Sequence, residues 1–210
     1  MPEPERTITI RGEAVVPAEP DELRLRLTVS AVHSRQAEAL QDVAARSQEL
    51  EALLTELGVS KPNRITSGLS IREKREWVDD RSEHRGYEAS NSVLVSLRDP
   101  KVVGHLLEGA VERAEAQVEG PWWHVNGGNP ARLEACRQAA QDAKRKAEAY
   151  AGAAGLTLGA IGSIRESADT PMGYGMVASS GSGRSVDGIG IEPGRLDVFA
   201  SVLITFAIER

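Results

Sequence analysis

The sequence is short of the residues that most often reveal a protein's chemistry. It has one cysteine, Cys136, so no internal disulfide can form, which is typical of a reducing compartment. Aromatic residues make up 4% of the chain. No apolar run approaches the roughly 18 residues that a membrane-spanning helix needs. Residues 1–6 are acidic and contain no apolar segment, so we expect no Sec-type signal peptide and a cytoplasmic protein. A processed periplasmic fragment remains the alternative.

Motifs for catalysis and metal binding are also missing. None of the four histidines lies in an HExxH motif, and no cysteine pair is available for zinc. His84 lies near Asp79, Asp80 and Glu83, but a solvated hairpin tip explains this group better than a metal site. We therefore predict no catalytic residue, no cofactor, no metal and no enzyme activity, although distant residues can converge in a fold. The net charge of −6 argues against nucleic acid or anionic membranes as partners.

Hydrophobic periodicity predicts an α+β fold in one domain, 1–210. Alternating apolar residues indicate strands, for example over 23–31 and 196–208, and apolar stripes indicate helices between them. Residues 22–126 follow the order β-α-β-β-α-β, the split pattern of ferredoxin-like units. Residues 129–210 add a long alanine-rich helix, a closing antiparallel strand pair and a mobile Gly/Ser loop at 169–194.

The alanine-rich helix has a clear start and a regular apolar stripe. Alanine recurs every four residues, at Ala131, Ala135, Ala139, Ala143, Ala147 and Ala151. Such a strip is shallow and suits a close contact with another backbone. Asn129 is predicted to cap the helix, with Pro130 in its first turn. We place Leu133 close to the stripe and interpret Cys136 as a small buried side chain rather than a reactive thiol.

The candidate interface or ligand surface contains Trp122, Trp123, His124 and Tyr174. Adjacent tryptophans on a strand point to opposite faces, so one is predicted in the core and the other at a surface or interface. Core packing of both on an irregular strand remains an alternative. His124 would face a pocket or simply lie at the surface, and Tyr174 makes the 169–194 loop slightly more apolar than a pure spacer.

Several segments together resemble one family. They are ITIRGEAVV near the start, PDELRLRLTV at 20–29, GYEASNSVLVSL at 86–97, ARLEACRQAAQDAKRKAEAYAGAAGLTLGAI at 131–161 and the closing EPGRLDVFASVLITF. In order and spacing they resemble the SIMPL-domain family, a bacterial group that includes periplasmic immunogenic and oxidative-stress-associated proteins. The resemblance implies an α+β fold and a tendency to homo-oligomerise, and it supplies no catalytic residues.

Two functional hypotheses follow. The first is a non-enzymatic, self-assembling protein with a stress-protective or scaffolding role, since a terminal strand such as 196–208 must be paired or covered to avoid aggregation. The second is a small-ligand binding module that uses the cleft between sheet and helices, with the 169–194 loop as a lid. Enzyme activity comes third.

Overall fold

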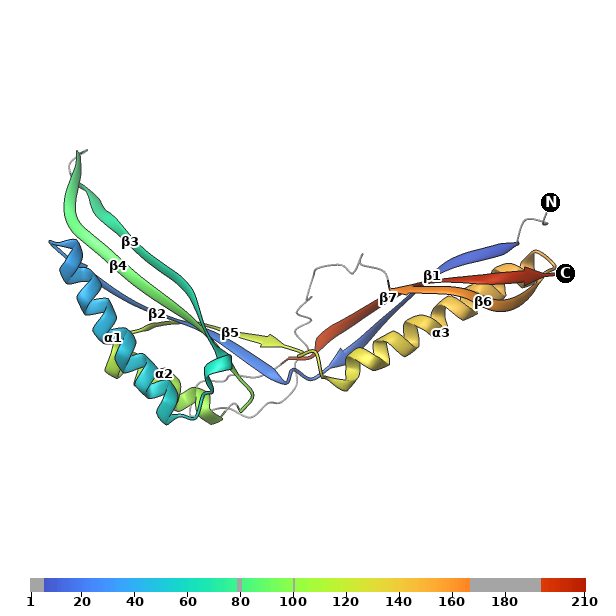
Figure 1. Cartoon of the computed structure of the whole chain (residues 1–210), viewed down its shortest axis with the longest axis horizontal. Helices are drawn as coiled ribbons and strands as arrows, with labels where there is room; N and C mark the ends of the chain where they lie inside the picture. Colours follow the sequence, from blue (N-terminus) through green and yellow to red (C-terminus); the bar gives the residue numbers. More distant parts are fainter. Residues whose placement is uncertain (1–5, 79–80, 100, 167–193) are drawn as a thin grey trace. The chain divides into compact units, whose positions relative to one another are not determined.

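The computed structural model of the protein describes residues 6–78, 81–99, 101–166 and 194–210. Nearly all of the predicted loop 169–194, with Tyr174, lies outside these residues. The elements shown in Figure 1 are β1 (Thr7–Ala18), β2 (Glu22–His33), α1 (Gln36–Glu56), the 3-10 helix η1 (Lys61–Asn63), β3 (Arg64–Val78), β4 (Arg81–Leu97), α2 (Lys101–Ala114), β5 (Gln117–His124), α3 (Pro130–Ala153), β6 (Thr157–Glu166) and β7 (Leu196–Glu209). Their order confirms the predicted α+β class.

The chain divides into two compact units. One unit is formed by β1, α3, β6 and β7, and the other by β2 to β5 with α1 and α2. The first strand therefore belongs with the C-terminal elements and not with its neighbour in sequence. That these two units together form the single predicted domain, 1–210, stays a prediction.

The unit from β2 to β5 is a four-stranded antiparallel sheet with both helices on one face. Its strand order is β3-β4-β2-β5, the order of a split β-α-β-β-α-β unit, so β3 and β5 are the edge strands. Alternate residues of β2 fill the core, namely Leu23, Leu25, Leu27, Val29 and Ala31. The residues between them, such as Arg24 and Arg26, lie on the opposite face. We call that opposite face the open face.

The other unit packs α3 against a three-stranded sheet in the order β1-β7-β6. The alanine stripe is confirmed, because Ala135, Ala139, Ala143, Ala147 and Ala151 are all buried. Gly12 on β1 lies directly under the helix, where an added Cβ would lie 2.0 Å from the carbonyl oxygen of Ala139. Small residues on both partners therefore allow backbone-to-backbone packing of α3 on β1.

Four expectations about this part of the chain have clear outcomes. Asn129 caps α3 as predicted, since its side chain accepts a hydrogen bond from the backbone N–H of Ala131. Leu133 is 65% exposed, so its placement close to the stripe is wrong, and Cys136 is exposed, so its predicted burial is wrong. Both lie off the line of every-fourth alanines, where the helix turns toward solvent. The closing strand β7 is the central strand of its sheet, paired with β1 and β6, and is not an edge.

Candidate functional site

A shallow groove of about 430 Å³ opens in the unit from β2 to β5, where β2 ends beside β4. It is lined by Val32, His33, Ser34, His84, Arg85 and Gly86. Gly86 has a φ of +112°, and a Cβ there would lie 2.4 Å from the carbonyl oxygen of His33. The groove therefore depends on a glycine that lets the two strands approach at this point.

Each histidine that lines the groove is held by a carboxylate. The Nε2 atom of His33 lies 2.9 Å from Oδ2 of Asp42 on α1. The Nδ1 atom of His84 lies 2.8 Å from Oε1 of Glu73 on β3, and its ring meets Tyr87 edge-on. The partner of His84 is thus Glu73, a residue outside the acidic group near His84 that the sequence suggested. Asp79 and Asp80 lie outside the described residues.

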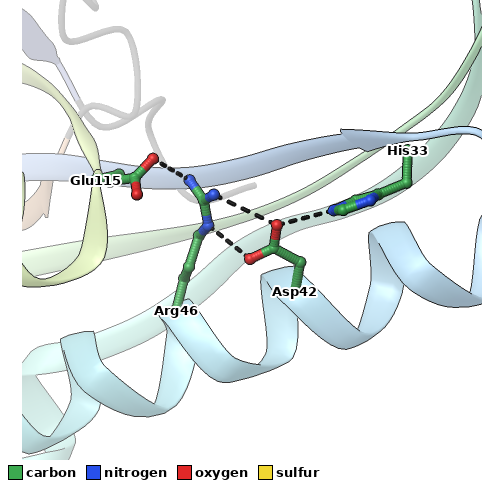
Figure 2. A network of polar contacts seen from close by, with 4 residues as sticks. All are labelled: His33, Asp42, Arg46 and Glu115. Atoms are coloured by element: carbon green, nitrogen blue, oxygen red, sulfur yellow. Dashed lines mark hydrogen bonds and ion pairs between the residues drawn. The ribbon is translucent and has the colours of Figure 1, made fainter.

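The first of these pairs belongs to a longer polar network (Figure 2). Arg46 donates from Nε to Oδ1 of Asp42 at 2.8 Å and from Nη1 to Oε2 of Glu115 at 2.7 Å. These hydrogen bonds, chiefly from Arg46 and then from His33, lower the pKa of Asp42. Glu115 follows α2 with a left-handed φ of +48°. The network therefore ties the end of β2, helix α1 and the end of α2 together.

Carboxylate–histidine pairs occur in general-base sites and around metal ligands, so their surroundings matter. In the part of the chain that the structure describes, neither His33 nor His84 hydrogen-bonds a serine, threonine or cysteine. The described ranges also contain no group of three or more His, Cys, Asp and Glu residues placed to hold a metal ion. These carboxylate–histidine contacts fix the orientation of the two imidazole rings at the groove.

Of the predicted surface residues on β5, Trp122 and His124 lie on one face of the sheet and Trp123 lies on the other. Trp122 and Trp123 face opposite sides as predicted: Trp123 packs on the core, while Trp122 is 39% exposed on the open face. The guanidinium of Arg26 lies 5.5 Å from the centre of the Trp122 ring. His124 lies on the same face as Trp122, opposite Glu22. Its pKa is lowered, first by burial and then by the charge of Arg24.

The edge strand β3 carries four of the large apolar side chains that are exposed in this unit. Ile65, Leu69, Ile71 and Trp77 are between 40% and 76% exposed. Helices α1 and α2 pack mainly on β2, β4 and β5, so the outer strand extends beyond their cover. In the described ranges β4 is the only strand that pairs with β3. The apolar residues of this strand are visible in the sequence, but their exposure is not.

The edge strand β1 of the other unit is different, because α3 covers its backbone. The Oδ2 atom of Asp142 accepts a hydrogen bond from the backbone N–H of Glu13 at 3.0 Å. Lys146 donates to the carbonyl oxygen of Arg11 at 3.3 Å and pairs with Asp142 at 2.6 Å. These contacts, with Lys146 the largest cause, lower the pKa of Asp142 to about 2. Side chains of α3 thus occupy backbone groups through which β1 could pair with another strand.

Sequence reasoning missed the His33–Asp42 pair and the Asp142–Lys146 contacts with β1. Neither has a motif spacing, because each joins a strand to a helix that only the fold brings near. The four-residue spacing of Asp142 and Lys146 indicates an ion pair on one helix face. It does not indicate that both side chains contact the backbone of β1. None of the helices in the described ranges combines the length and apolar character needed to cross a membrane.

Comparison with known proteins gives a consistent result. Residues 8–206 match the model of the SIMPL family, described as proteins of unknown function (DUF541). The chain is 29% identical over 177 residues to the 26 kDa periplasmic immunogenic proteins of Brucella melitensis biotype 1 and Brucella abortus, which covers 79% of this chain and 68% of each relative. It is 28% identical over 166 residues to the uncharacterized protein YggE of Edwardsiella ictaluri, which covers 79% of this chain and 69% of that relative. The family match spans both compact units, and the chain belongs to the SIMPL family.

Proposed function

We propose that this chain is a non-enzymatic, self-assembling protein with a stress-protective or scaffolding role. The observation that carries the proposal is the exposed edge of β3, with Ile65, Leu69, Ile71 and Trp77 in solvent. An unpaired strand edge that also exposes apolar side chains favours pairing with another chain. Closed symmetric assembly of identical chains buries such an edge without leading to open-ended aggregation.

The contrast with β1 supports β3 as the surface that assembles. On β1 the backbone groups of Arg11 and Glu13 are already bound by side chains of α3. On β3, Leu69 and Ile71 lie on the face that the helices cover, but beyond the helices. Ile65 lies on the open face, opposite Leu94. The proposal therefore places self-association on β3 rather than on β1. The other edge of the β1 sheet, β6, exposes Ile161 and Ile164, and an unchanged mass of the β3 variant below would point to β6 instead.

The proposed compartment rests on the relatives. The Brucella relatives are named periplasmic immunogenic proteins. We extend that compartment to this chain in place of the cytoplasmic location expected from its first residues. Cell fractionation of the tagged full-length protein tests this: recovery in the periplasmic fraction is expected, and recovery only with a cytoplasmic marker contradicts it.

Multi-angle light scattering tests self-assembly. The full chain is expected to run above its monomer mass of 22.5 kDa and to shift toward that mass on dilution. Trp77→Asp should weaken assembly, because it places a charge on the exposed edge. Leu133→Asp is the matched control, since Leu133 is similarly exposed but lies on α3 of the other unit. A strict monomer at high micromolar concentration contradicts the proposal.

The groove at His33 and His84 favours a second candidate, a small-ligand binding module. The space between sheet and helices in this unit is filled by buried side chains, so the groove replaces the predicted sheet–helix cleft as the place for a ligand. Titration of a metabolite library, followed by the imidazole NMR signals of His33 and His84, tests it. Unchanged signals with every compound would retire this candidate.

A further inference from the structure

We propose that β3 pairs in an antiparallel manner with β3 of a second copy, about a two-fold axis at Lys74. The paired segment is 70–78, the outer half of the strand. This inference rests on the proposed self-assembly and adds the register and the contacts. It starts from the position of β3 at the edge of its sheet, where β4 is the only pairing strand in the described part of the chain.

The residue order of the segment is self-complementary about Lys74. In this register Glu73 lies opposite Arg75 of the second copy, Arg72 opposite Glu76, and Ile71 opposite Trp77. Each pair occurs twice because the axis is two-fold. Directly opposite side chains of antiparallel strands are close enough to interact, and opposite charges or apolar pairs stabilise the sheet. The pairing would cover two of the exposed apolar side chains of the edge, Ile71 and Trp77.

Neighbouring registers are worse. The nearest two-fold registers that keep every side chain on its face have the axis at Glu73 or at Arg75. An axis at Glu73 places Arg72 opposite Lys74, and an axis at Arg75 keeps one opposite-charge pair, Lys74 with Glu76, but places Glu73 opposite Trp77. Like charges directly opposite each other are destabilising. Slipping by one residue also moves every side chain to the wrong face of the joined sheet. The charge pattern therefore favours a single register.

Two features of the edge oppose the pairing, and both can be accommodated. Lys74 meets its own copy on the axis, but its flexible stem can direct the ammonium toward Glu76 of the second copy, the diagonal neighbour. Within one chain Arg75 already pairs with Glu73, Arg72 with Glu88 and Glu76 with Arg85, and Glu73 also holds His84. These ion pairs are largely exposed, and exposed pairs are weak and exchangeable. The burial of Ile71 and Trp77 is then the net gain.

Cysteine cross-linking tests the register in the full chain. In a Cys136→Ser background, Lys74→Cys places two thiols opposite each other at a Cα separation of about 4.5–5.5 Å, which suits a disulfide. Arg72→Cys is the control, because in this register its two copies lie four positions apart, about 13 Å. Mild oxidation is expected to give a covalent dimer with Lys74→Cys and background levels with Arg72→Cys. Equal cross-linking of both variants, or none with Lys74→Cys, overturns the register.

Charge exchange provides a second readout. Arg72→Glu places like charges opposite each other twice, so the dimer dissociation constant should rise on the order of tenfold. Adding Glu76→Arg restores opposite charges and should restore association. A chain that is always monomeric defeats the proposed self-assembly itself. A chain that assembles without cross-linking at Lys74→Cys and without rescue by the double variant defeats only this register.

Discussion

Replacing Gly12 with alanine tests the helix–strand packing most sharply. The new Cβ would lie 2.0 Å from the carbonyl oxygen of Ala139, 2.6 Å from the amide nitrogen of Ala143 and 2.7 Å from its Cβ. Ordinary contact begins at 3.4 Å, so α3 would have to move away from β1 by about 1.4 Å. The obstacle is backbone, which cannot change rotamer to make room.

The cost follows from that displacement. A gap of even about 0.5–1 Å removes a quarter to a half of the dispersion energy of the contacts it opens. The alanine stripe of α3 would lose contact along much of its length. Overpacking of this kind costs about 1–3 kcal/mol or more, against a gain of about 0.4–1 kcal/mol from the less flexible unfolded chain. We expect a net loss of about 2 kcal/mol in the free energy of unfolding.

Urea unfolding followed by far-UV circular dichroism measures this loss, and hydrogen exchange places it on α3. Gly162→Ala is the control: Gly162 lies in the same sheet, where an added Cβ would have its nearest neighbour, the Thr205 carbonyl oxygen, at 3.7 Å. It should change stability by less than about 0.5 kcal/mol. Tryptophan fluorescence is a further control, since all three tryptophans lie in the other unit. Equal stability of the two variants would refute the packing argument.

Three further predictions concern individual side chains. Asp142→Asn should lower the free energy of unfolding by about 1–2 kcal/mol at neutral pH. Folding lowers the pKa of Asp142 from 3.8 to about 2. The stability that the Asp142 carboxylate contributes is therefore present above this pH interval and is lost as the pH falls through it. Urea unfolding at several pH values checks this, and a difference from the native chain that persists below pH 2 contradicts it. Arg46→Met should lower the free energy of unfolding by about 1–2 kcal/mol. It should also raise the pKa of Asp42 toward its ordinary value, because Arg46 is the main cause of the lowering. An NMR titration that finds the pKa of Asp42 unchanged would reject this prediction. Cys136 should react with a thiol reagent in the folded protein, and labelling only after denaturation would show that it is not exposed.

Local patterns predicted much of the fold because they report which face of each element is buried. Alternation on β2 and the alanine stripe on α3 depend on neighbours in the sequence, and both are confirmed. Leu133 and Cys136 show the limit of this reasoning. Each is apolar and close in sequence to the stripe, but the angle of its position around the helix places it in solvent.

Long-range pairing was not predictable in the same way. The pairing of β1 with β7 joins Thr7 to Ala207, and nothing local to either strand indicates this partner. The same holds for His33 and Asp42, which lie on different elements. The exposure of β3 depends on where the helices end on the sheet. The apolar pattern of β3 alone could not distinguish an edge from a covered strand.

Hydrogen exchange of the β3 amides, measured as a function of protein concentration, reports whether identical chains assemble through this edge. We expect amides in 70–78 to become more protected as concentration rises, while those near Glu13 on β1 do not change, because Asp142 already binds there. Protection of 70–78 that is independent of concentration would contradict assembly through β3.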